Sequence, residues 1–230
     1  MSLRRGAAAP CVLAAALLAL GHAPAFGGAE EILARLRAVN ADLVDLRASF
    51  VHGRDVPLFD EKILSSGELF FRAPDRLLLQ YADPDSNLVV IGEGHVWLYY
   101  PSLRQAHRYD IDPESTLPGL FLAIRGTLAG LERNFDVLGM RDEDSTGAAT
   151  DVLVLHPKEG SVLAEEVREI RVVVRRADAL PVRTDFWEVS GDHSWFAFSR
   201  YARNPRIDES VFRFEPPEGT EVFEVEGETW

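Results

Sequence analysis

Cysteine is almost absent from this chain, and its one occurrence lies near the N-terminus. Arg4 and Arg5 precede a short apolar run, Cys11–Leu20, and a small-residue Ala-Pro-Ala sequence ends at Ala25. This pattern predicts a secretory signal peptide, residues 1–25, that is cleaved after Ala25. Because Cys11 leaves with the peptide, the mature chain would have no disulfide, thiolate nucleophile or thiolate metal site. We also do not expect a lipid-anchored receptor, which would need a cysteine directly after the apolar run.

Long apolar runs and basic residues are scarce as well. After residue 25 no segment offers the ~18 uninterrupted apolar residues that a membrane-spanning helix needs. The chain has 24 basic and 37 acidic residues, and residues 1–25 contain two of the former and none of the latter. The mature net charge is therefore 22 − 37 = −15. This charge argues against nucleic acid and against tight docking on an anionic bilayer, and it suits a protein that must stay dispersed in an envelope compartment.

Motifs of catalysis and metal binding are missing too. We find no GxSxG, HExxH, CxxC or P-loop sequence, and no GxGxxG after a strand. Asp192-His193-Ser194 does not form a triad, because adjacent residues on an extended strand point to opposite faces. The mature histidines have no ligand spacing. We expect strand-surface positions for them, including His95 and His107, which would meet only if their strands pair. We predict a protein that is not an enzyme and uses no metal or cofactor.

The most informative segment that is present covers residues 66–109. Its strands are apolar at successive positions, at Leu69–Phe71, Leu77–Leu79, Leu88–Ile91 and Val96–Tyr100. A strand in a one-layer antiparallel sheet alternates apolar and polar residues instead. Both faces of this sheet therefore need apolar cover. We expect helices to pack on one face and the other to line a cavity for a lipid.

Periodicity along the mature chain predicts one helix followed by many strands. Residues 29–46 carry apolar residues at Ile32, Leu36, Val39 and Leu43, which is the stripe of an amphipathic helix. About eleven short strands follow, the last at 211–214, and Gly92-Glu93-Gly94 marks a hairpin. The strands are interrupted by a short helix from Ser115 to Gly126. Strands at such regular spacing are typical of a sandwich or a barrel.

Four motifs occur in the order in which they occur in a known family. They are ASF at 48–50, SGEL at 66–69 with PDRL at 74–77, GHVWLYYPSLRQ at 94–105, and NPRI at 204–207 with FRF at 212–214 and PEG at 217–219. The third motif is the most specific. Over residues 30–223 the chain resembles the periplasmic outer-membrane lipoprotein carrier family, LolA.

The resemblance implies a fold and a function. The fold would be mainly β (α+β): a curved, incompletely closed antiparallel barrel, with the N-terminal helix and the short central helix as a lid, in one domain over 26–230. The function would be that of a monomeric periplasmic carrier without cofactor. It would shield the acyl chains of lipoproteins and move them from an inner-membrane exporter to an outer-membrane receptor. Each buried methylene is worth ~0.8 kcal/mol, so acyl chains need such a shield in water.

Strand alternation indicates which side chains share a face, although it does not fix which face is inward. Leu77, Leu79 and Tyr81 share one face, and so do Trp97 and Tyr99. We predict a lipid-binding cavity lined by Phe50, Leu69, Phe71, Leu77, Leu79, Tyr81, Trp97 and Tyr99, beneath a lid that contributes Leu120, Phe121 and Ile124. For each residue the alternative is plain core packing, and for the lid it is a helix that caps the barrel permanently.

The sequence departs from the family at one position. Many members have a basic residue immediately before the turn proline, at the cavity rim, where this chain has Ala73. Arg72 and Arg76 lie nearby and are candidates for the rim, but a shift of one residue turns a strand side chain to the other face. Their alternative role is that of solvated charges at strand ends.

The departure at Ala73 leaves other functions open. One is a paralogue that carries a glycolipid or another acyl lipid. Another is a lipid-sensing regulatory module that binds an envelope signalling protein, although such regulators usually contain a second domain.

Overall fold

The computed structural model describes residues 28–110, 134–143 and 149–225. In these ranges twelve strands form one sheet in the order β12-β6-β5-β4-β3-β2-β1-β11-β10-β9-β8-β7, and its two end strands do not pair with each other. Neighbouring strands are antiparallel, except that β12 runs parallel to β6. The strands are β1 (Asp45–Val56), β2 (Glu61–Arg72), β3 (Arg76–Asp83), β4 (Leu88–Gly92), β5 (His95–Tyr100), β6 (Gln105–Asp110), β7 (Phe135–Glu143), β8 (Ala149–Pro157), β9 (Val167–Arg175), β10 (Pro181–Glu188), β11 (His193–Arg203) and β12 (Glu221–Val225).

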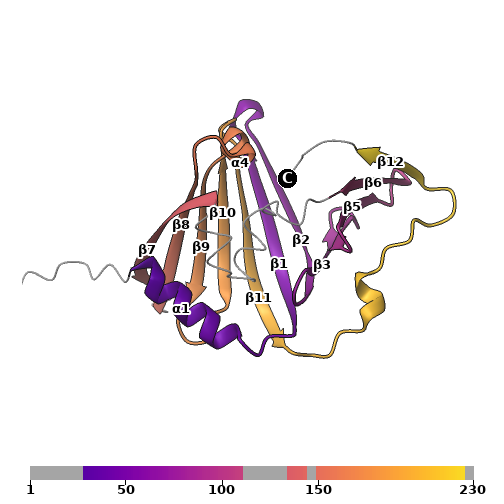
Figure 1. The fold of residues 1–230 in the computed structure, drawn as a ribbon. Coiled ribbons are helices and arrows are strands. Elements are labelled where there is room, and N and C mark those ends of the chain that lie inside the picture. The colour runs from indigo at the N-terminus through magenta and orange to yellow at the C-terminus, as the bar shows by residue number, and fades with distance from the viewer. Residues whose placement is uncertain (1–27, 111–133, 144–148, 226–230) are drawn as a thin grey trace, which may run out of the picture.

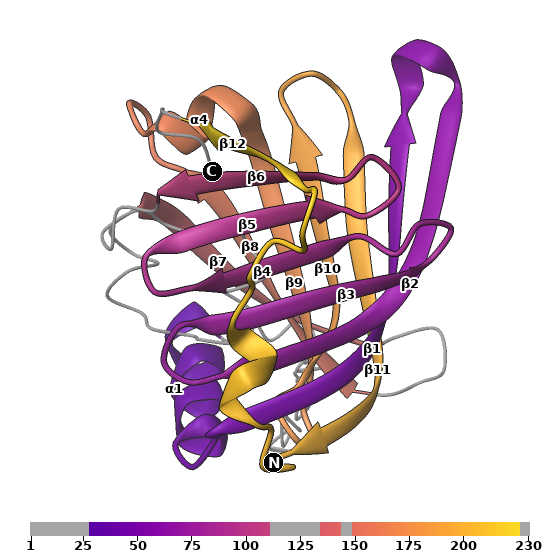
Figure 2. The same cartoon turned by 90° about the vertical axis from the view of Figure 1, so that its right-hand side faces the viewer.

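The sheet is strongly curved. Figure 1 shows β3, β5 and β6 to the right of β8–β10, and Figure 2 shows β3–β6 crossing in front of β8–β10, while β1 and β2 connect the two halves. We call the face that carries Phe50 the inner face and the opposite one the outer face. The expected mainly β, curved and incompletely closed architecture is confirmed.

Helix α1 (Ala29–Asn40) covers the inner face of β7–β9. Glu30 and Glu31 lie in its first turn, where the helix dipole favours negative charge. Its buried stripe, Ile32, Leu33 and Leu36, packs in one apolar cluster with Phe135, Leu153, Leu155, Ile170 and Val172. The predicted amphipathic helix is therefore present, although it ends at residue 40 rather than 46.

A buried ion pair fixes α1 to the sheet. The Asp151 side chain on β8 is 1% exposed and pairs with Arg35 of the helix. Arg176 also binds Asp151, with 2.9 Å between Nε and Oδ1. At the end of the helix, Arg203 of β11 donates a hydrogen bond to the Val39 carbonyl, 2.8 Å away. The apolar cluster and these polar contacts place α1 at one end of the inner face.

The remaining connections agree in part with the sequence analysis. Glu93 and Gly94 both have positive φ, as a two-residue hairpin turn between β4 and β5 requires. The expected last strand, 211–214, is wrong: the 3₁₀-helix η2 spans Glu209–Phe212 there, and β12 follows it. Two further short helices are η1 (Pro57–Phe59) and α4 (Val162–Glu166). The expected central helix, 115–126, lies outside the described residues.

The helices found in the described ranges are short. None of them combines the length and the apolarity that crossing a membrane requires.

Candidate functional site

The inner face of β1–β5 is an apolar surface assembled by strand register. Leu69 lies opposite Leu79, and Phe71 lies opposite Leu77. Leu77 in turn lies opposite Ile91, which pairs with Val96. Because side chains on directly paired residues share a face, this ladder joins four strands. The same cluster includes Phe50, Leu43, Leu46, Leu79, Leu180, Phe196 and Phe198, with Tyr81, Val89, Leu98, Tyr109, Phe186 and Tyr201 packed against it.

Aromatic rings form the centre of this surface. The Phe50 ring makes an edge contact with Tyr81, with 5.0 Å between centroids, and a tilted contact with Phe196 at 5.8 Å. The Phe50 ring lies over Gly67 of β2, where an added Cβ would stand 2.8 Å from Phe50 Cζ and 2.1 Å from the Gln80 carbonyl oxygen. The glycine of the SGEL motif therefore makes room for the aromatic side chain and for the neighbouring strand.

Six of the eight residues predicted to line a cavity lie together on this face. They are Phe50, Leu69, Phe71, Leu77, Leu79 and Tyr81. Their grouping follows from alternation along β2 and β3 and from the antiparallel pairing of those strands.

Trp97 and Tyr99 are not brought together with these six. Trp97 lies opposite Val90, so both of them are on the outer face. There the Trp97 and Tyr99 rings contact the Phe214 ring, with centroid distances of 5.3 and 5.1 Å.

The residues of β5 that do face inward are Val96, Leu98 and Tyr100, and none of the three was among the predicted cavity residues. A signal for them was present in the hairpin. A two-residue turn at Glu93-Gly94 places Gly92 opposite His95, and this register pairs Val96 with Ile91. The inward phenylalanines of β11, Phe196 and Phe198, were missed because nothing local shows that β11 pairs with β1.

One polar pair lies within the apolar surface. The Tyr81 hydroxyl is 3.1 Å from Nδ1 of His52, and the His52 ring stacks on Phe196 with centroids 4.1 Å apart. Burial, and secondarily the charge of Arg54, lower the pKa of His52 to about 4. Burial also raises the pKa of the Tyr81 hydroxyl well above its usual range. Both groups are therefore neutral at pH 7.

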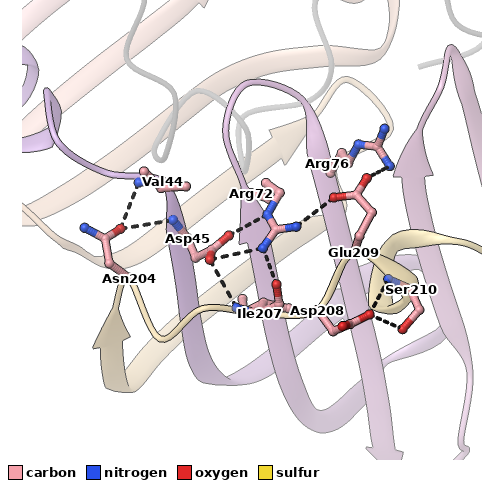
Figure 3. Close-up of polar contacts among 9 residues, drawn as sticks. All are labelled: Val44, Asp45, Arg72, Arg76, Asn204, Ile207, Asp208, Glu209 and Ser210. Atoms are coloured by element: carbon pink, nitrogen blue, oxygen red, sulfur yellow. Dashed lines mark hydrogen bonds and ion pairs between the residues drawn. The ribbon is translucent and has the colours of Figure 1, made fainter.

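Arg72 lies on the outer face, where it holds the C-terminal segment (Figure 3). Its Nε donates to Asp45 Oδ1 over 2.7 Å, and its Nη1 pairs with Glu209 Oε2 at 2.7 Å. Arg72 also donates to the Ile207 carbonyl oxygen, and its guanidinium lies 5.5 Å from the centre of the Phe212 ring. The hydrogen bond from Arg72 holds the pKa of the buried Asp45 carboxyl below its usual range.

Arg76 and Asn204 extend the same network. Arg76 Nη1 lies 2.5 Å from Glu209 Oε1, so one carboxylate binds both arginines. The Asn204 side-chain oxygen accepts hydrogen bonds from the backbone N–H groups of Val44 and Asp45, at 2.8 and 3.1 Å. Neither arginine is therefore placed as a free cation beside the apolar surface.

The chain from 204 to 214 is thus a strap across the outer face of β3–β5, as Figure 2 shows. Phe212 within it is 3% exposed. The two-sided apolar pattern predicted helices on one face of these strands; the strap covers the outer face instead. The predicted lid residues Leu120, Phe121 and Ile124 lie outside the described residues. Within the described ranges, no three His, Cys, Asp or Glu side chains gather as a metal site would require.

Comparisons with known proteins agree with this architecture. The family model described as "Outer membrane lipoprotein carrier protein LolA" matches residues 48–215. The outer-membrane lipoprotein carrier protein of Alkalilimnicola ehrlichii is 27% identical over 219 residues, which cover 94% of this chain and 94% of the relative. That of Methylibium petroleiphilum is 27% identical over 210 residues, covering 91% and 95%.

A solved structure shows the same fold at low sequence identity. It is an uncharacterized conserved protein of Thermus thermophilus, with a TM-score of 0.53 and 17% identity, covering 86% of this chain and 99% of that one.

The family model extends from β1 to the strap and so spans well over half of the chain. The chain therefore belongs to the LolA family.

Proposed function

We propose that this protein is a periplasmic carrier that shields the acyl chains of lipoproteins and delivers them from the inner to the outer membrane. The observation that carries the proposal is the apolar inner face of an unclosed sheet, lined by Phe50, Leu69, Phe71, Leu77, Leu79 and Tyr81. The full-length relatives that are outer-membrane lipoprotein carrier proteins support the same assignment.

Physical chemistry supports an apolar, non-directional site for such cargo. Each methylene removed from water contributes ~0.8 kcal/mol, so an acyl chain is held strongly without specific polar contacts. Release must follow at the outer membrane, and an apolar surface allows it because no covalent bond is made or broken. The carrier needs no catalytic group, metal or cofactor for this task.

The cellular location that we propose follows from the N-terminal segment and the net charge. We infer that residues 1–25 direct export and are removed, and that residues 26–230 act in the periplasm as one monomeric domain. A net charge of −15 keeps such a domain dispersed between two membranes. The partners would be an inner-membrane exporter and an outer-membrane receptor.

A second candidate, carriage of a glycolipid or another acyl lipid, is favoured by the contacts of the two arginines. Ala73 stands where many family members have a basic rim residue, and both neighbouring arginines bind Glu209 on the outer face. Mass spectrometry of the material bound to the protein in its native envelope separates the two. Triacylated protein supports lipoprotein carriage, whereas a protein-free acyl lipid supports the second candidate.

Acyl binding is tested with a synthetic triacylated lipopeptide and the same peptide without acyl chains. The purified protein should bind only the former. Leu98→Gln places an amide at a half-buried position of the inner face and should weaken binding about tenfold, because an apolar environment penalises an unpaired polar group. Val51→Gln is the matched control, since Val51 is 37% exposed on the outer face of β1. Absence of lipopeptide binding, or equal loss in both folded variants, contradicts the proposal.

A further inference from the structure

His52 and Tyr81 meet inside the apolar surface although they belong to strands that are not neighbours. His52 is on β1 and Tyr81 is on β3, with β2 between them. Tyr81 pairs with Gly67 of β2, which has no side chain to separate the two rings. The Tyr81 hydroxyl therefore reaches His52 Nδ1 across β2, at 3.1 Å. The pairing of β1, β2 and β3 therefore brings the two side chains together.

The pair lies where the inner face passes from buried to exposed. Along β1, Phe50 is 2% exposed, His52 is half-buried and Arg54 is exposed. Along β3, Leu79 is 5% exposed, Tyr81 is half-buried and the strand ends at exposed Asp83. Both strands thus run from apolar through neutral polar to charged. An acyl lipid has the same order of groups: a hydrocarbon chain, a carbonyl linkage and a polar head.

One hydrogen-bond donor of the pair is left over when the Tyr81 hydroxyl donates to Nδ1 of His52, because the neutral imidazole then carries its own proton on Nε2. We assign this tautomer to His52. Among the described residues, Nε2 of His52 has no hydrogen-bond partner. A half-buried N–H group beside apolar rings is a site for a neutral acceptor, because a buried donor gains most when it is paired.

We propose that the His52–Tyr81 pair binds the carbonyl oxygen that links an acyl chain to its carrier molecule, with the Nε2–H group of His52 as donor. The inference rests on the proposed function, because the acyl chain would lie along Phe50 and Leu79 on the same face. An uncharged donor pair selects a neutral ester or amide carbonyl over a carboxylate, which would bring a charge into an apolar site. Ester and amide linkages share this chemistry and both occur in acylated molecules.

The test compares uncharged ligands with and without the carbonyl. Dipalmitoylglycerol with its dihexadecyl ether analogue, and N-methylpalmitamide with the uncharged analogue methyl hexadecyl ether, compete against a fluorescent acyl probe on the mature protein. Each carbonyl compound should bind roughly five- to tenfold more tightly than its analogue, the gain of one hydrogen bond. The two pairs show whether ester, amide or both are recognised. His52→Phe should abolish the preference and retain ether binding, since a phenyl ring can keep the stack on Phe196.

His107→Phe is the matched control, because His107 is also stacked on an aromatic ring, that of Phe223, with centroids 5.0 Å apart. It should leave the preference intact. If His52→Phe does not fold, the ¹⁵N resonance of His52 Nε2 in the unaltered protein serves instead, and it should shift with the ester and not with the ether. Equal binding of ester and ether, or a preference that survives in His52→Phe, overturns this inference alone. Failure of every acyl compound to bind overturns the proposed function as well.

Discussion

The two faces of β3–β5 are both apolar, yet they are covered in different ways. On the outer face the chain covers itself: the strap places Phe212 and Phe214 against the strands, and Arg72 fixes it through Asp45 and Glu209. The inner face carries a continuous aromatic and aliphatic cluster that ends in half-buried Tyr81 and Leu98. Two-sided apolar strands therefore do not indicate two ligand surfaces. One face is satisfied by the protein's own C-terminal segment.

The polar groups differ between the faces in the same sense. The outer face uses charged partners, with one carboxylate bound by two arginines and a second, Asp45, held by Arg72 and the Ile207 N–H. On the inner face of β1–β3 the polar contact is the neutral pair of His52 and Tyr81. Charged pairs with multiple hydrogen bonds fix a permanent contact. A neutral pair beside apolar rings suits a ligand that binds and leaves.

The largest effect is expected from breaking the outer network. Arg72→Ala removes the charged partner of the Asp45 side chain, which is 5% exposed, and leaves a buried carboxylate with the Ile207 N–H as its remaining partner. We expect the free energy of unfolding to fall by about 3–5 kcal/mol, measured by urea denaturation. Arg76→Ala is the control and should cost less, because Glu209 keeps Arg72 and is 43% exposed. If Arg72→Ala and Arg76→Ala lower the free energy of unfolding equally, the greater importance assigned to Arg72 is wrong.

The next effect concerns the inner face and depends on pH. The folded-state pKa of His52, about 4, lies below the ordinary value of 6.5, because burial and Arg54 disfavour the charged ring. Between these two pKa values the unfolded state binds more protons than the folded state. The free energy of unfolding therefore decreases as the pH falls. This group alone should lower the free energy of unfolding by about 3 kcal/mol from pH 7 to pH 4. In His52→Phe the decrease in the free energy of unfolding from pH 7 to pH 4 should be smaller by that amount. If the free energy of unfolding depends on pH in the same way in both proteins, this prediction is wrong.

Much of this architecture was predictable from local patterns. The stripe at Ile32 and Leu36 predicted α1, and the Glu93-Gly94 turn predicted the hairpin of β4 and β5. Alternation along β2 and β3 grouped Leu69, Phe71 and their partners correctly. These features depend on residues close together in the sequence, where periodicity and turn geometry carry the information.

The strap was not predictable in the same way. Asn204 has a positive φ and bonds to the backbone of Val44 and Asp45, about 160 residues earlier in the chain. The NPRI motif was visible, but no local pattern shows where its partners lie. Trp97 and Tyr99 were assigned to the inner face because they share a face with each other, whereas only the register with β4 shows which face that is. Long-range pairing is what the single sequence leaves undetermined.

The smallest effect separates the two faces most directly. Phe214→Ala removes the ring that contacts Trp97 and Tyr99 and should lower the free energy of unfolding by about 1–2 kcal/mol, less than for a fully buried ring because Phe214 is half-buried. Affinity for the triacylated lipopeptide should stay within twofold of the unaltered protein, since the strap lies on the other side of the sheet. Leu98→Gln should show the opposite pattern, with weaker binding out of proportion to its stability. If Phe214→Ala weakens binding as much as Leu98→Gln does, the outer face takes part in binding and the assignment of roles to the two faces is wrong.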